Sequence, residues 1–263
     1  MASATLAVAR AADPGFRYLA EARAKANSPY GLPIVDDMRD FQLGDQSFFS
    51  GLTSESMEDF NRIQHTTSYP ESAVVLMEGQ APRGVYVVCR GRVKLMTTNS
   101  EGKTLIVKIA GPGEVLGLQS VVMDSPYELT AETLQPSQLA YVGRDQFLKF
   151  LKAHGDACLR ATQHLSGDCQ SAYEVIRSIG LCHSVAGKLA RLLKTWSSEA
   201  PMSNGVARIK ISLTHEELAQ LIGSSRETVT RILGDFKRRG VVELSGATLT
   251  IRNRSALDTL CVS

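Results

Sequence analysis

The period of apolar and polar positions changes along this chain, and each change predicts a different kind of structure. Between residues 73 and 141, short runs rich in Val, Ile, Leu and Tyr alternate with Gly, Pro and Asn breaks. Strands this short and this regularly interrupted are typical of an antiparallel sandwich or barrel. From Arg144 to about Ser178 the apolar positions recur at helical spacing, with a break near Gly155. Residues 213–240 then carry two further amphipathic helices.

The two helices of residues 213–240 are separated only by a short Gly-Ser-Ser break, so they must cross steeply as a helix-turn-helix. Thr214 and Glu217 have the spacing of a capping box, and Ser224 and Glu227 repeat it at the second helix. The apolar positions expected to face inward are Leu218, Ile222, Val229, Ile232, Leu233 and Phe236. The second helix keeps a polar outer face of Arg226, Glu227, Thr230 and Arg231.

This polar face lies in the first two turns, where a recognition helix presents side chains to base edges. Arg can bond guanine through two hydrogen bonds, and Glu can accept one from a cytosine amino group. The alternative is that Glu227 and Arg231 form only a solvated ion pair, worth about 0.3 kcal/mol. We favour DNA recognition because spacing, caps and polarity agree.

Beyond Gly155 the long helix carries a stripe of apolar or small residues spaced alternately by four and three, over about three heptads. A stripe this narrow is typical of a coiled-coil seam, since helices that face a core show a wider one. It predicts a homodimer, although the stripe could instead pack only on its own β-domain. The seam positions are Cys158, Thr162, Leu165, Cys169, Ala172, Ile176 and Ile179.

The end of the chain predicts a wing. Residues 181–196 have the pattern of another helix, residues 197–205 that of a loop, and ARIKIS that of an edge strand. After Gly240, VVEL and TLTI flank residues 245–247 as a hairpin. The helix-turn-helix followed by this hairpin defines a winged helix.

The motif SSRETVTRIL resembles the recognition helix of the catabolite activator and FNR (CRP/FNR) family of bacterial transcription regulators, and the match continues through VVELSGATLTI. The resemblance runs from about Phe48 to the C-terminus. It implies an α+β fold, in which an antiparallel β-roll, a jelly roll like those that bind cyclic nucleotides, precedes a dimerisation helix and a winged helix-turn-helix. We expect an extension over 1–46, the β-roll sensor domain over 47–143, the dimerisation helix over 144–180 and the DNA-binding domain over 181–263.

The resemblance also implies roles for single residues. The family reads bases with the Arg, Glu and second Arg of R-E-T-V-x-R, which here are Arg226, Glu227 and Arg231. Thr230 lies among them but departs from the family pattern. Arg at position 226 goes with a TGTGA-type half-site, whereas the FNR branch reads TTGAT. A homodimer on double-stranded DNA with an inverted repeat is expected, with RNA polymerase as a further partner. The positions that align with DNA-backbone contacts are Ser225 and Thr228.

The family's cyclic-nucleotide pocket uses a Gly-Glu-Leu turn, an Arg-Ser pair about ten residues later and a Thr-Ser pair on the dimer helix. The corresponding residues form the possible effector pocket of this chain: Gly117, Leu118, Gln119, Ser120, Glu128, Leu129 and Tyr173. The Gly is retained, but the Glu, the Arg and the hydroxyl pair are absent, and Glu128 would repel a phosphate. Cyclic AMP is therefore not expected to bind in the usual way.

The amino-acid composition and the distribution of charge also indicate two domains. With 263 residues, 43% of them hydrophobic, it can build two cores. Residues 183–263 carry 12 Lys and Arg against 7 Asp and Glu, a net +5, which leaves −3 for the remainder. A basic excess confined to the helix-turn-helix end is typical of a domain that meets phosphates. Because the sequence shows neither a long apolar run nor a secretory signal, a cytoplasmic protein without a membrane span is expected.

Other chemistries find little support. The five cysteines include no C-x-x-C pair and none precedes Cys89, so a zinc site, a disulfide framework and an FNR-type iron-sulfur cluster are not expected. No nucleophile elbow, P-loop or metal-ligand spacing indicates an enzyme, and no cofactor is expected. A sensor that acts through protein contacts is the alternative function, but it would not need the base-reading set of Arg226, Glu227 and Arg231.

Overall fold

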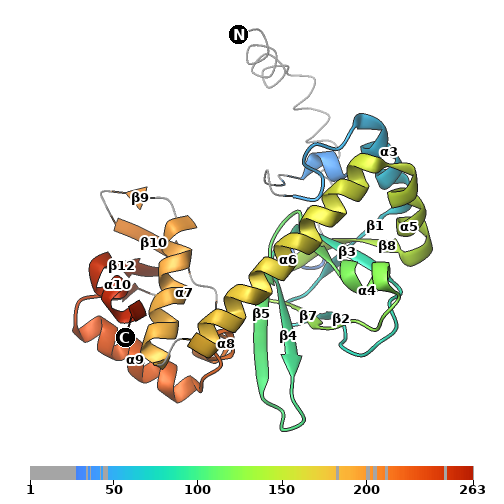
Figure 1. The fold of residues 1–263 in the computed structure, drawn as a ribbon. Helices are drawn as coiled ribbons and strands as arrows, with labels where there is room; N and C mark the ends of the chain where they lie inside the picture. The colour runs from blue at the N-terminus through green and yellow to red at the C-terminus, as the bar shows by residue number, and fades with distance from the viewer. Residues whose placement is uncertain are drawn as a thin grey trace.

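The computed structural model describes residues 28–262, apart from residues 34, 36, 42, 44–46, 182–183, 200–201, 204–205, 211–212 and 246–247. Most of the expected N-terminal extension lies outside these residues. Figure 1 shows a β-domain joined by a long helix, α6 (Gly155–Leu181), to a smaller C-terminal domain. None of the helices in the described part of the chain is long and apolar enough to cross a membrane.

The β-domain consists of two four-stranded antiparallel sheets, as the short interrupted strands predict. The first has the order β1 (His65–Tyr69), β8 (Ser137–Gly143), β3 (Gly84–Arg90) and β6 (Val115–Leu116). The second has the order β2 (Val74–Leu76), β7 (Thr130–Thr133), β4 (Val93–Thr98) and β5 (Thr104–Ala110). Side chains alternate between the two faces of a strand. In β3, Val85 and Val87 therefore face the helices, whereas Val88 faces the second sheet, and all three are fully buried.

Helices cover the outer face of the first sheet. They are α3 (Ser54–Ile63), the short α4 (Leu118–Met123), α5 (Arg144–Ala153) and the first turns of α6. Phe48, Phe60 and Phe147 are fully buried between the helices and the sheet. Met38 in η1 (Met38–Asp40) and Phe41 join the same core at 1% and 6% exposure. The end of the extension expected over 1–46 therefore packs on the β-domain, because it carries two large apolar side chains.

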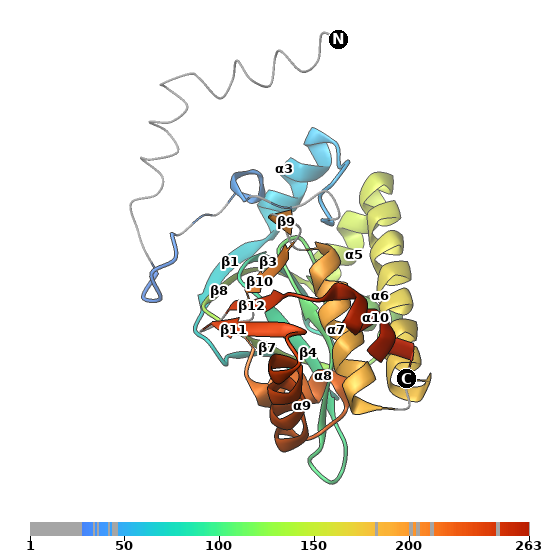
Figure 2. The same ribbon diagram turned by 90° about the vertical axis from the view of Figure 1, so that its left-hand side faces the viewer.

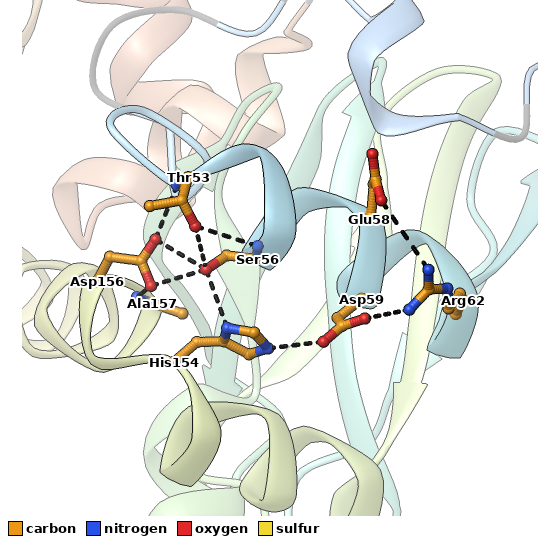
Figure 3. A network of polar contacts seen from close by, with 8 residues as sticks. All are labelled: Thr53, Ser56, Glu58, Asp59, Arg62, His154, Asp156 and Ala157. Atoms are coloured by element: carbon orange, nitrogen blue, oxygen red, sulfur yellow. Dashed lines mark hydrogen bonds and ion pairs between the residues drawn. The ribbon is translucent and has the colours of Figure 1, made fainter.

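A polar network fixes the break between α5 and α6, which lies near Gly155 as predicted. The Ser56 hydroxyl contacts both Asp156 oxygens at 2.8 Å and His154 Nδ1 at 3.1 Å, and His154 Nε2 lies 3.1 Å from Asp59 Oδ2 (Figure 3). Desolvation acts to raise the pKa of Asp156, but hydrogen bonds from Thr53, Ser56 and the Ala157 N–H bring it down to about 2. The network joins α3 to the start of α6.

The seam positions of α6 do not all share one environment. Cys158, Thr162, Cys169 and Ile176 are exposed, whereas Leu165, Ala172 and Ile179 are half-buried. Leu165 packs against the β-roll core. The exposed apolar side chains of the helix are Leu159, Tyr173, Ile176 and Leu181. One edge of the stripe therefore packs on the β-roll, as the alternative interpretation expects, whereas the other edge faces solvent and the homodimer stays a prediction.

The C-terminal domain is a winged helix. Its sheet has the order β11 (Val242–Ser245), β12 (Thr248–Ile251), β10 (Val206–Lys210) and β9 (Met202–Ser203). Its helices are α7 (Val185–Glu199), α8 (His215–Ile222), α9 (Arg226–Arg238) and α10 (Arg254–Val262). The strand β9 and the end of α7 occupy the stretch predicted as a loop, and α10 was not predicted. Figure 2 shows α10 beside α7, where Leu257 is fully buried.

Candidate DNA-binding surface and effector pocket

The first helix of the helix-turn-helix begins with the predicted capping box. The Thr214 hydroxyl accepts from the Glu217 N–H at 3.2 Å, and Glu217 Oε2 accepts from the Thr214 N–H at 2.9 Å. The helix ends at Gly223 in the left-handed conformation, with φ of 63°. Glycine adopts this conformation without the steric cost of a Cβ, so the chain can turn sharply into α9.

The start of the second helix differs from the prediction. Ser225, not Ser224, is the N-cap, and its hydroxyl accepts from the Thr228 N–H at 3.3 Å. The Ser224 N–H donates instead to the Ala219 carbonyl at 2.9 Å, so Ser224 completes the end of α8. Glu227 is therefore one position too early to close a capping box.

The two helices pack on one apolar surface, as their spacing predicts. Each of the six inward-facing side chains is at most 7% exposed, and they form one core with α7 and the wing. These residues are Leu218, Ile222, Val229, Ile232, Leu233 and Phe236. This core fixes the direction in which α9 presents its opposite face.

That opposite face carries the predicted base-reading residues. Arg226, Glu227, Thr230 and Arg231 are all exposed. No ion pair within the described residues joins Glu227 to Arg231, in contrast to the solvated-pair alternative. Hydrogen bonds from its own backbone N–H and from the Ser225 hydroxyl lower the pKa of Glu227, so the carboxylate stays charged near neutral pH. Its charge and both guanidinium groups are available to an external partner.

Thr230 is held by two hydrogen bonds, neither of which was predicted from the sequence. Its hydroxyl donates to the Arg226 carbonyl at 2.9 Å and lies 2.9 Å from His215 Nδ1. His215 begins α8, so this contact joins the two helices on the exposed side. Ser225 and Thr228 lie at the tip of α9 and share a hydroxyl hydrogen bond of 3.0 Å.

Basic side chains continue toward the end of α9. Arg238 and Arg239 pair with Asp235 at 3.3 and 3.5 Å. Lys237 is exposed and makes no ion pair with any other residue that the structure describes. In the wing, Arg252 pairs with Glu243 at 2.5 Å.

The possible effector pocket is built around Gly117 and Ser120. Gly117 has φ of 76°, and a Cβ there would lie 2.7 Å from the Tyr127 ring, so only glycine fits. Leu118 is buried and Gln119 exposed. The fully buried Ser120 donates its hydroxyl proton to Glu128 Oε2 at 2.7 Å. A carboxylate therefore lies against α4, at the position where the resembled pattern has an arginine.

Leu129 and Tyr173 complete the residues predicted for this pocket. Leu129, next to Glu128, is half-buried and directly precedes β7. Tyr173 is 57% exposed on α6, and its hydroxyl interacts with Cys169, which raises the tyrosine pKa. Tyr173 thus lies on the exposed edge of α6.

The contacts of Ser56, His154 and Asp59 have the order of a hydrolytic triad, but their geometry serves structure. Ser56 is fully buried, and its hydroxyl is held by the Asp156 carboxylate, so no substrate carbonyl can reach it. Both ring nitrogens of His154 are also engaged within the protein (Figure 3). This set stabilises the helix junction.

Comparison with known families assigns both domains. Residues 66–154 match the cyclic nucleotide-binding domain, and residues 187–260 match the Crp-like helix-turn-helix domain. A CRP-like cAMP-activated global transcriptional regulator of Mycobacterium tuberculosis is 24% identical over 216 residues, which cover 82% of this chain and 96% of the relative. The cyclic AMP receptor protein of Thermus thermophilus is 26% identical over 220 residues, covering 81% and 95%.

Solved structures agree with this assignment. TTHA1359, a CRP/FNR-family transcriptional regulator of Thermus thermophilus, superposes with a TM-score of 0.58 at 26% identity, covering 76% of this chain and 99% of that one. The c-di-GMP-responsive global regulator CLP of Xanthomonas campestris shares the fold with a TM-score of 0.67 at 21% identity, covering 76% and 100%. These relatives are transcription regulators rather than enzymes. The chain belongs to the CRP/FNR family of DNA-binding transcription regulators.

Proposed function

We propose that this regulator acts as a homodimer that reads a TGTGA-like inverted repeat through α9. The main support is that Arg226, Glu227 and Arg231 are exposed at the start of α9, with no ion pair between Glu227 and Arg231. In the proposed complex the two arginines bond guanines and Glu227 accepts from a cytosine amino group. Ser225 and Thr228 contact the DNA backbone, and bound RNA polymerase is the downstream partner.

The exposed edge of α6 supports the dimer. Ile176 is 64% exposed and Tyr173 is 57% exposed, one turn apart on the side away from the β-roll. Large apolar side chains aligned along a helix mark a surface that another chain covers. A two-fold axis along α6 would place two copies of α9 in successive major grooves, about 34 Å apart.

The β-roll in this proposal does not bind cyclic AMP in the usual way. Two relatives are named for their response to cyclic AMP. In this chain, however, the Glu128 carboxylate accepts from Ser120 beside α4. An anionic phosphate placed there would meet a like charge instead of an arginine, which costs binding energy. The β-roll acts as a scaffold or takes a different effector.

Fluorescence anisotropy on synthetic duplexes tests the proposal. One duplex carries two TGTGA-type half-sites with centres about 11 base pairs apart, a second carries one half-site, and a third is scrambled. We expect binding to the repeat to be roughly a thousandfold tighter than to the scrambled duplex, with the single half-site between them. Equal affinity for all three duplexes would remove the base-reading role of α9.

A further inference from the structure

The β-roll and the helix-turn-helix touch directly through β5 and α8, next to the end of α6. In Figures 1 and 2, α8 lies beside β5 and the lower end of α6, while α9 faces outward. A Cβ added to Gly223 at the turn would lie 3.9 Å from both Leu105 Cδ1 of β5 and Ile179 Cδ1 of α6. The contact is therefore made by α8 and the turn, and the DNA-facing side of α9 stays free.

A charged triad lies in this contact. Lys94 Nζ of β4 is 2.9 Å from Glu132 Oε1 of β7 and 3.3 Å from Glu217 Oε1 of α8. The three side chains are only 12%, 19% and 16% exposed. Lys94 and Glu132 are direct neighbours across the β4–β7 ladder, so the β-roll positions the lysine without any contribution from α8.

Glu217 has two functions at once. Its Oε2 closes the capping box with Thr214, while its Oε1 accepts from Lys94. The ion pair therefore acts on the residue that starts the first helix of the DNA-binding motif. Without Lys94, the carboxylates of Glu132 and Glu217 would face each other in a partly buried site, and like charges repel strongly where water is scarce.

The strand that supplies Glu132 also leaves the possible effector pocket. The chain runs from Glu128 directly into β7, which spans Thr130–Thr133. Glu132 lies four residues after Glu128, so a displacement of the Ser120–Glu128 contact is passed to it along a short piece of chain. The triad therefore connects the strand that follows that pocket to α8 through two ion pairs.

We propose that Lys94, Glu132 and Glu217 form an interdomain latch that holds the helix-turn-helix in the orientation that binds DNA. This inference rests on the proposed function and adds a regulatory contact to it. Because the latched arrangement leaves the base-reading face exposed, releasing it reduces the fraction of protein in the binding orientation. Apparent affinity falls in proportion to that fraction.

The test compares five variants of the full-length protein by anisotropy on the TGTGA-type repeat at fixed salt. Lys94→Met removes the cation, and Lys94→Arg keeps it. Glu217→Gln weakens the ion pair but keeps the capping box, because Gln serves at that position as well as Glu. Lys103→Met is the matched control, since Lys103 is exposed in the β4–β5 turn and the substitution makes the same charge change. The fifth variant combines Lys94→Met with Glu217→Gln.

We expect Lys94→Met and Glu217→Gln to raise Kd roughly five- to tenfold, while Lys94→Arg and Lys103→Met stay within about twofold of the unmodified protein. The double variant should bind no more weakly than Lys94→Met, because Glu217→Gln removes the repulsion from Glu132. Any of three results would overturn the latch. Lys94→Met and Glu217→Gln could both have the same Kd as Lys103→Met, or the double variant could show a further additive loss of affinity. The third result is tighter DNA binding by Lys94→Met.

Hydrogen exchange separates failure of the latch from failure of the proposed function. In the unliganded protein, amides of α8 should exchange faster in Lys94→Met than in Lys103→Met, whether or not the duplex is the right one. If the unmodified protein does not distinguish the repeat from scrambled DNA, the proposed function fails and exchange alone tests the contact. Equal exchange in the two variants would show that the contact does not hold α8.

Discussion

Ile176→Glu tests the dimer seam with little disturbance to the protomer. Ile176 is 64% exposed in the single chain, so a carboxylate there should change protomer stability by no more than about 0.5 kcal/mol. At a two-fold interface the same change acts twice. Burying the exposed part of an isoleucine contributes about 2 kcal/mol, so losing two of them costs about 4 kcal/mol before any repulsion between the carboxylates.

That cost corresponds to roughly a thousandfold increase in the dimer dissociation constant, since each 1.4 kcal/mol is a factor of ten. Sedimentation equilibrium across a concentration series measures it, against a protomer mass of 28.5 kDa. Gln170→Glu is the matched control, because it adds one carboxylate to the exposed surface of the same helix outside the seam. An unchanged dissociation constant for Ile176→Glu, with the protomer still folded by circular dichroism, would refute the seam.

Three further predictions concern DNA, ligand and pH. Arg226→Val should cost about 1–3 kcal/mol of binding free energy on a TGTGA-type repeat and relax the preference at one base. Lys237→Ala should instead weaken binding to all sequences alike and flatten its salt dependence. Equal losses on all sequences for Arg226→Val would argue against base reading. Millimolar cyclic AMP should leave the melting temperature unchanged, whereas a ligand at 100 times its Kd would stabilise by about 2.7 kcal/mol; a clear upward shift would contradict the role given to Glu128. Because the folded-state pKa of Asp156 is depressed to about 2, the stabilisation by its carboxylate is present above about pH 4 and is lost as pH falls toward 2. The melting temperature of Asp156→Asn should therefore lie below that of the unmodified protein at about pH 4 and above, and this difference should shrink between about pH 4 and pH 2. A difference that stays constant would show that the charge is not involved.

Local signals explain why the helix-turn-helix could be predicted in detail. Caps and apolar spacing act within a few residues, so Thr214, Glu217 and the buried face through Phe236 follow from the sequence. The error at Ser224 arose because two adjacent serines offer the same signal. The left-handed Gly223 directs the Ser224 N–H back to α8 and leaves the cap to Ser225.

Features that depend on distant parts of the chain were not predicted. The strand runs indicated a sandwich, but the order of its strands depends on pairing between distant segments. The heptad stripe showed where α6 is apolar, not that Leu165 would face the β-roll while Ile176 faces solvent. Lys94 and Glu217 are 123 residues apart, and no local pattern joins them. By contrast, α10 had a usable signal, since Asn253 Oδ1 caps it by accepting from the Ala256 N–H at 3.0 Å.

Selection of binding sites from random duplexes tests most directly whether α9 reads DNA as a symmetric pair. The full-length protein is incubated with a randomised library, and bound sequences are recovered over several rounds. We predict that the recovered sequences are inverted repeats of TGTGA-type half-sites with centres about 10 to 11 base pairs apart, which places guanines opposite Arg226 and Arg231. Recovery of TTGAT-type half-sites, or of sequences without a repeated half-site, would contradict it.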